Sequence, residues 1–192
     1  MDSLRVLAYR RRNTAHGAVQ HQGVTRVIDL RSQTTACALI ALGAGFALAA
    51  AWYFQLVVGL APCPLCLTQR IAYYIAVPTA LVLAGLSARG LRTVSRLGLA
   101  LLALLMLGNA GIAGYHAGIE WGLWIGPTAC SGGAPVVVSD IMSALKTAHV
   151  PRCDEAAWRF LGLSMAGWNA LIALSLAAIA ALGATGGRRR AA

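Results

Sequence analysis

Two cysteines separated by two residues are the strongest chemical signal in this 192-residue sequence. Cys63 and Cys66 form a C-x-x-C pattern. A disulfide between them would close a ring too small to add much fold stability. The same spacing is usual for dithiols that open and close, and it commonly lowers the pKa of one thiol. The pair is therefore predicted to be redox-active.

The surroundings of Cys66 favour a thiolate. The residue follows Pro62 and Pro64 and precedes a long apolar run, so we expect it at or just before a helix N-terminus. The helix dipole and the free backbone N–H groups there stabilise negative charge. Arg70 lies one helical turn further on and can share a face with Cys66. Its guanidinium could stabilise the thiolate or polarise a carbonyl oxygen of a bound acceptor, or it could simply extend to the membrane interface.

The remaining cysteines permit more than one interpretation. Cys130 and Cys153, with 22 residues between them, could form a structural cross-link or a second redox pair. Cys37 stands alone in an apolar run, which is typical of a small buried residue. No metal site is expected, because such a site would need two tight pairs or histidines at ligand spacing, and only His116 and His149 lie nearby.

Composition places the chain in a membrane. Of its residues 58% are hydrophobic and only 11% are charged, against about 25% charged in a soluble domain. The charges leave four long gaps, and a bilayer core needs roughly 20 apolar residues of helix, so each gap holds one span. The predicted spans lie near residues 35–56, 70–88, 97–117 and 160–182.

The distribution of arginine and lysine predicts the orientation. Twelve of these residues, with two acidic residues, lie on the side of both termini, and four, with four acidic residues, lie on the other. The whole net charge of +10 therefore sits on one side. The positive-inside rule makes that side cytoplasmic. A short loop at about 57–69 and a long loop at about 118–159 then face the periplasm. The arginines adjoin the spans rather than forming a folded basic domain, so no nucleic-acid partner is expected.

The expected architecture is an all-α membrane protein with a four-helix bundle. The redox domain should cover residues 34–184, between a basic cytoplasmic tail at 1–33 and a second one at 185–192. Small residues should let the helices pack closely, and Gly114 with Gly118 forms a G-x-x-x-G pattern typical of helix contacts.

The sequence resembles the DsbB-type disulfide bond formation proteins over about residues 34–182. Three stretches carry the resemblance, and they are Cys63-Pro64-Leu65-Cys66-Leu67-Thr68-Gln69-Arg70, Gly111-Ile112-Ala113-Gly114-Tyr115-His116, and Cys153-Asp154-Glu155 with the following Trp158-Arg159-Phe160-Leu161-Gly162-Leu163-Ser164-Met165.

The resemblance implies a thiol:quinone oxidoreductase of the bacterial inner membrane. Such an enzyme passes electrons from a DsbA-like periplasmic thiol oxidase to a membrane quinone, here expected to be ubiquinone rather than menaquinone. By this resemblance Cys63 and Cys66 match the pair near the quinone, and Cys130 and Cys153 match the pair that meets the oxidase. Arg70 and His116 match the residues at the quinone.

Two alternatives remain open from the residues. The protein could be a dedicated oxidase of one secreted substrate, or a non-catalytic membrane scaffold held by two permanent disulfides. The long loop departs from the best-known family members at Trp121-Gly122-Leu123-Trp124 and at Ser131-Gly132-Gly133, which leaves the exact thiol partner undetermined.

Overall fold

The computed structural model describes residues 32–127 and 152–186. Within these residues four helices are long and apolar enough to cross a membrane, which confirms the predicted fold class. They are α2 (Gln33–Leu56), α3 (Pro64–Ala88), α4 (Arg92–Glu120) and α6 (Met165–Thr185), and a short hairpin of β1 (Arg159–Phe160) and β2 (Leu163–Ser164) precedes α6. Of the predicted tails at 1–33 and 185–192, residues 1–31 and 187–192 lie outside the described part.

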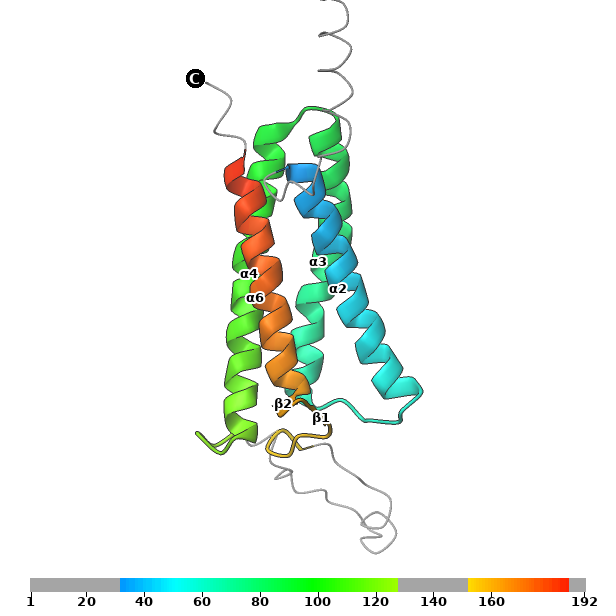
Figure 1. The fold of residues 1–192 in the computed structure, drawn as a ribbon, viewed down its shortest axis with the longest axis vertical. Helices are drawn as coiled ribbons and strands as arrows, with labels where there is room; N and C mark the ends of the chain where they lie inside the picture. Colours follow the sequence, from blue (N-terminus) through cyan, green and yellow to red (C-terminus); the bar gives the residue numbers. More distant parts are fainter. Residues whose placement is uncertain (1–31, 128–151, 187–192) are drawn as a thin grey trace, which may run out of the picture.

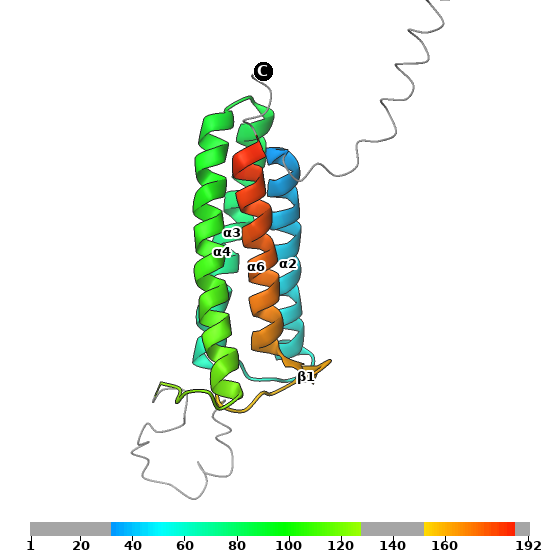
Figure 2. The same cartoon turned by 60° about the vertical axis from the view of Figure 1, so that its left-hand side comes forward.

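The helices form a bundle in which α2 and α4 each pack against α3 and α6 (Figures 1 and 2). A short turn joins α3 to α4 at one end of the bundle, where α2 begins and α6 ends. The loop after α2, the end of α4 and the β-hairpin gather at the opposite end. The topology therefore brings the start of α3 close to the start of α6, although they are far apart in sequence.

Three helix starts differ from the sequence-based spans. Helix α4 begins at Arg92 rather than near residue 97, and the starts of α3 and α6 differ for local reasons. Helix α3 begins at Pro64 rather than near residue 70, because Cys63 caps it and proline is well suited to the first helical position. Helix α6 begins at Met165 rather than near residue 160, because residues 159–164 form the hairpin. Leu161 and Gly162 both adopt positive φ in its two-residue turn. The Ser164 hydroxyl then accepts a hydrogen bond from the Gly167 N–H and caps the helix.

Small residues fill the interior of the bundle, as expected. Fully buried alanines pack with Ile40, Leu99 and Met106, while large side chains such as Leu101 and Leu104 are exposed on the outside, where lipid would surround them. Two helices approach closely at Gly183 on α6, where an added Cβ would lie 2.6 Å from the Ala36 Cβ on α2.

The G-x-x-x-G prediction was wrong. A Cβ on Gly114 would meet no atom within 4 Å, and one on Gly118 would meet the ring of Trp124 rather than a neighbouring helix. The Trp124 indole N–H donates to the Tyr115 carbonyl, and its ring stacks on Tyr115, so Gly118 makes room for a returning loop. The pattern of glycines alone does not say which helix face they occupy.

Gly183→Ala is expected to destabilise the bundle by about 1–3 kcal/mol, because the new methyl group would force α6 away from Ala36. The control is Gly45→Ala on α2, where an added Cβ meets nothing within 4 Å. Reversible unfolding of both variants in detergent measures the difference. Equal stability of the two variants would contradict the close approach of α2 and α6.

Candidate redox site

Cys63 and Cys66 are positioned by the start of α3. Cys63 is the N-cap residue, and its Sγ accepts a hydrogen bond of 3.2 Å from the backbone N–H of Cys66 in the first turn. The two sulfurs are 2.7 Å apart and both cysteines are free thiols in this structure. A disulfide has an S–S bond of about 2.05 Å, so the pair could close with a small movement.

The negative charge of this pair belongs on Cys66. The Cys63 thiol donates to the Cys66 sulfur, and that hydrogen bond together with burial raises the pKa of the Cys63 thiol far above its ordinary value. Cys66 is partly exposed and lies in the first turn of α3, where the helix dipole stabilises a thiolate. This arrangement agrees with the location that the sequence predicted for Cys66.

Cys153 lies against this pair. Its side chain is fully buried, and it packs with Cys63 in one small cluster that also includes Leu65 and Cys66. The adjacent Asp154 accepts two hydrogen bonds from Arg152, which lower the pKa of that exposed carboxyl group. Cys130 lies outside the described residues. Cys37 is buried near the other end of α2 and is remote from the site.

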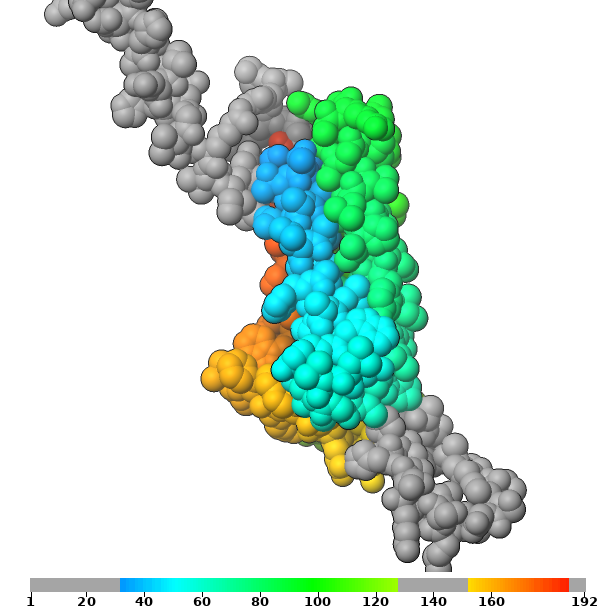
Figure 3. Space-filling view, turned by 90° about the vertical axis from the view of Figure 1, so that its right-hand side faces the viewer, coloured from blue at the N-terminus to red at the C-terminus, as the bar shows by residue number. Residues whose placement is uncertain are grey.

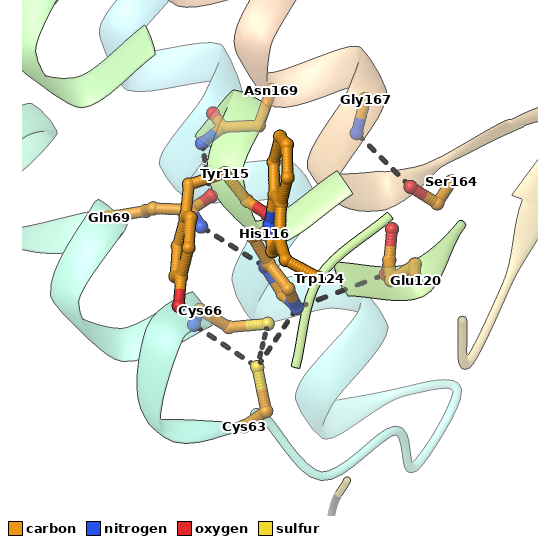
Figure 4. Close-up of polar contacts among 10 residues, drawn as sticks. All are labelled: Cys63, Cys66, Gln69, Tyr115, His116, Glu120, Trp124, Ser164, Gly167 and Asn169. Atoms are coloured by element: carbon orange, nitrogen blue, oxygen red, sulfur yellow. Dashed lines mark hydrogen bonds and ion pairs between the residues drawn. The ribbon is translucent and has the colours of Figure 1, made fainter. Parts of the chain in front are cut away.

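His116 of α4 reaches both Cys63 and the Cys153 segment. Its Nε2 is 3.7 Å from the Cys63 Sγ and 3.9 Å from the Glu120 Oε1, and its ring makes a hydrogen bond with the backbone of Cys153. Figure 4 shows the imidazole above the two sulfurs of the C-x-x-C pair. The structure thus brings His116 to the cysteines, where the sequence suggested it only through the family resemblance.

Three polar residues inside the bundle were missed by the sequence reasoning. Gln69 and Tyr73 of α3 and Asn169 of α6 connect to His116 through side-chain hydrogen bonds (Figure 4 labels Gln69 and Asn169). Their signal in the sequence was their polarity within apolar spans, because polar residues inside a membrane are costly and commonly functional.

Arg70 is directed toward α2. Its Nη1 donates to the Gln55 Oε1 at 2.5 Å, its Nη2 donates to the Ala51 carbonyl at 3.3 Å, and its guanidinium carbon lies 5.8 Å from the centre of the Trp52 ring. These contacts hold the charge one helical turn from Cys66, where it favours a thiolate on that residue. Sequence reasoning predicted the shared helix face but not the contacts with α2.

A cavity of about 560 Å³ opens beside the cysteines. Its polar lining includes Cys66, Arg70 and His116, and its apolar lining includes four large aromatic side chains, Phe46, Phe54, Trp158 and Trp168. Phe54 and Trp158 are in ring contact, with centroids 5.0 Å apart, so α2 meets the segment before α6 here. In the space-filling view the loop after α2 and the segment before α6 form one continuous surface (Figure 3). Such a cavity suits a flat apolar ligand with a polar oxygen.

Cys63, Cys66 and His116 also offer three possible metal ligands within 4.8 Å of one another, a grouping that the sequence spacing did not predict. The hydrogen bonds of the histidine oppose metal binding in this arrangement. The Gln69 Nε2 donates to the His116 Nδ1, which places the ring proton on Nε2, the nitrogen that faces the sulfurs. A metal ion at the sulfurs would require the opposite tautomer.

Comparison with known proteins agrees with the resemblance seen in the sequence. The family model described as "Disulfide bond formation protein DsbB" matches residues 33–183. No solved structure gives a significant match to the chain.

Several curated proteins named "Disulfide bond formation protein B" are similar to the chain. The one from Methylococcus capsulatus is 35% identical over 146 residues, covering 70% of this chain and 84% of that protein. The one from Albidiferax ferrireducens is 33% identical and covers 74% and 84%, and the one from Verminephrobacter eiseniae is 33% identical and covers 84% and 93%. With a family match across the whole four-helix bundle and relatives of this similarity, the chain belongs to the DsbB family of disulfide bond formation proteins.

Proposed function

We propose that this inner-membrane protein reoxidises a periplasmic thioredoxin-fold thiol oxidase like DsbA and passes the electrons to a membrane quinone, ubiquinone rather than menaquinone. Membership of the family already makes it an oxidoreductase of disulfide bond formation. The observation that carries the finer proposal is the meeting of Cys153, Cys63 and Cys66 in one cluster beside the aromatic cavity.

The contact of Cys153 with Cys63 supports a path for the electrons from the second cysteine pair to the first. A thiolate of the reduced partner would attack Cys130 in a Cys130–Cys153 disulfide. A mixed disulfide between the partner and Cys130 forms, the Cys130–Cys153 bond breaks, and Cys153 leaves as a thiolate. The Cys153 thiolate would then attack the Sγ of Cys63 in the Cys63–Cys66 disulfide. A Cys63–Cys153 bond forms, the Cys63–Cys66 bond breaks, and Cys66 leaves with the electron pair as a thiolate. This exchange needs the contact between Cys153 and Cys63 that the cluster provides.

The cavity beside Cys66 fits a quinone. The reduced Cys63 and Cys66 would give two electrons to the quinone and close again to a disulfide, and with two protons the product would be a quinol. The aromatic side chains on the cavity wall would contact the quinone ring. Arg70, held in place by Gln55 and Ala51, would present its positive charge to a quinone oxygen. The partner is already a strong oxidant, at about −120 mV for DsbA, so its reoxidation requires an acceptor of higher potential.

The positive-inside rule supports periplasmic cysteines. The ends of the helices near Cys63 and Cys153 carry few arginines, and the turn between α3 and α4 at the opposite end carries Arg89 and Arg92. We therefore assign the end with the β-hairpin to the periplasm, where disulfides persist.

Purified protein should reduce a soluble ubiquinone analogue when supplied with a reduced thioredoxin-fold partner. Cys66→Ala should abolish the reaction, because no thiolate would remain beside the cavity. Arg70→Gln should lower the rate at least tenfold, since the charge-assisted contact to the quinone oxygen would be lost. The absorbance change of the quinone measures both effects.

The matched control is Arg159→Gln, an exposed arginine at the same end of the bundle that does not line the cavity. It should retain the wild-type rate. The proposal fails if Cys66→Ala still reduces quinone, or if the two arginine variants lose activity equally.

The double variant Cys66→Ala, Cys130→Ala should form a Cys63–Cys153 disulfide under mild oxidation, because these two side chains already pack together. Proteolysis between the two positions followed by mass spectrometry detects the link. Cys37, buried at the far end of α2, should remain a free thiol and serves as the internal control. A product in which Cys63 remains unlinked would argue against exchange between the two loops.

A further inference from the structure

We propose that Gln69, Asn169 and Tyr73 are positioning residues whose hydrogen-bonded chain holds His116 in the tautomer that carries its proton on Nε2, the nitrogen that faces the sulfur of Cys63. The use of this tautomer in disulfide exchange rests on the proposed function. The tautomer itself is inferred from the hydrogen bonds alone.

The hydrogen-bonded chain joins side chains of three helices. The Tyr73 hydroxyl donates to the Asn169 Oδ1 at 2.5 Å, the Asn169 Nδ2 donates to the Gln69 Oε1 at 2.6 Å, and the Gln69 Nε2 donates to the His116 Nδ1 at 3.1 Å. Each amide has one donor end and one acceptor end, so the direction of one hydrogen bond sets the direction of the next. The ring nitrogen of His116 that accepts from Gln69 cannot carry the proton, so the proton is on Nε2.

The groups around the His116 Nε2 also favour a proton on that nitrogen. The Cys63 thiol has a single hydrogen, which it donates to Cys66, so toward the His116 Nε2 its sulfur can only accept. The Glu120 Oε1, 3.9 Å from the same nitrogen, is also an acceptor. An unprotonated Nε2 would face these groups without a donor. The groups around the His116 Nε2 and the hydrogen bond from Gln69 to Nδ1 therefore favour the same polarity.

Burial makes this polarity persistent. Gln69, Tyr73 and His116 are 4%, 3% and 3% exposed, so water has little access to replace one of their partners. Reversing the chain would require both amides to rotate together, and a half-rotated state would leave a buried donor unpaired. Stabilising the contacts between helices would be enough to explain why these polar side chains are buried in the bundle. It would not explain why the chain ends on the one ring that contacts both Cys63 and the backbone of Cys153.

The tautomer has a use when the Cys63–Cys153 disulfide is resolved. The second thiol of the partner first displaces Cys130 from the mixed disulfide, so the partner leaves oxidised and Cys130 becomes a thiolate. This thiolate attacks the Cys153 Sγ, a Cys130–Cys153 bond forms, the Cys63–Cys153 bond breaks, and Cys63 leaves with the electron pair as a thiolate. A buried thiolate is a poor leaving group unless a donor stabilises it. The His116 Nε2–H is that donor, and it acts on Cys63 without transferring a proton.

The first test reads the tautomer directly. The chain has four histidines, so His16→Gln, His21→Gln and His149→Gln leave His116 as the only one. Nitrogen-15 NMR of this background protein in lipid nanodiscs should show a protonated Nε2 and an unprotonated Nδ1. Gln69→Glu should move the proton to Nδ1, because a carboxylate can only accept. Tyr73→Phe and Asn169→Leu should give mixed tautomers.

The matched control is Tyr74→Phe. Tyr74 is the neighbour of Tyr73, and its hydroxyl accepts a hydrogen bond from Trp52 rather than joining the hydrogen-bonded chain to His116. Removal of this hydroxyl should leave the His116 tautomer unchanged. Tyr73→Phe removes only a hydroxyl group, so it tests the chain even if Asn169→Leu fails to fold. A tautomer that is the same in all folded variants would overturn the proposal.

The second test measures, without quinone, how fast Cys63 is released from the Cys63–Cys153 disulfide. In protein with Cys66→Ala and Cys130→Ala, glutathione can open the Cys63–Cys153 disulfide by attack on Cys153, and mass spectrometry counts the product with a free Cys63. Loss of one neutral hydrogen bond should slow this product about three- to tenfold in Tyr73→Phe and Gln69→Glu, and not in Tyr74→Phe. A tautomer that moves with no change in this rate would overturn the positioning role. Failure of quinone reduction alone would contradict the proposed function and leave this inference standing, because neither readout uses quinone.

Discussion

The hydrogen bond from the backbone N–H of Cys66 to the sulfur of Cys63 is the interaction on which the site depends. It makes Cys63 the N-cap of a membrane helix, so the start of α3 fixes both sulfurs at once. The same geometry keeps Cys63 buried and protonated and leaves the charge on Cys66 at the helix terminus. The roles of the two thiols are thereby set by their positions in the first turn of one helix.

Polar side chains inside the bundle extend this local constraint across three helices. Helix α3 contributes Gln69 one turn after Cys66 and Tyr73 one turn later, so the helix that carries the cysteines also carries the residues that face His116 and Asn169. Arg70, next to Gln69, points to α2 instead. Consecutive residues of α3 thus serve two sides of the site: one holds the histidine at the sulfurs, and the other holds a positive charge beside the cavity.

The amino-acid sequence predicts the parts of this structure that depend on local pattern. Gaps between charges located four spans, and the proline-flanked C-x-x-C placed Cys66 at a helix start. The hairpin at 159–164 was not predicted, because its turn residues lie in an apolar, uncharged run. Contacts between helices were also beyond the pattern. Neither the packing of Cys153 on Cys63 nor the bond from Gln69 to His116 follows from spacing, since each joins segments that only the tertiary fold brings together.

The central claim is that Cys63 and Cys66 deliver electrons to a membrane quinone. The most direct measurement is the redox state of these two cysteines in cells, trapped by acid and a thiol-alkylating reagent, with and without respiratory quinone. The account predicts that the pair is mainly oxidised when quinone is present and accumulates in the reduced form when quinone is depleted. If Cys63 and Cys66 stay fully oxidised after quinone is removed, the pair does not cycle and the account is contradicted.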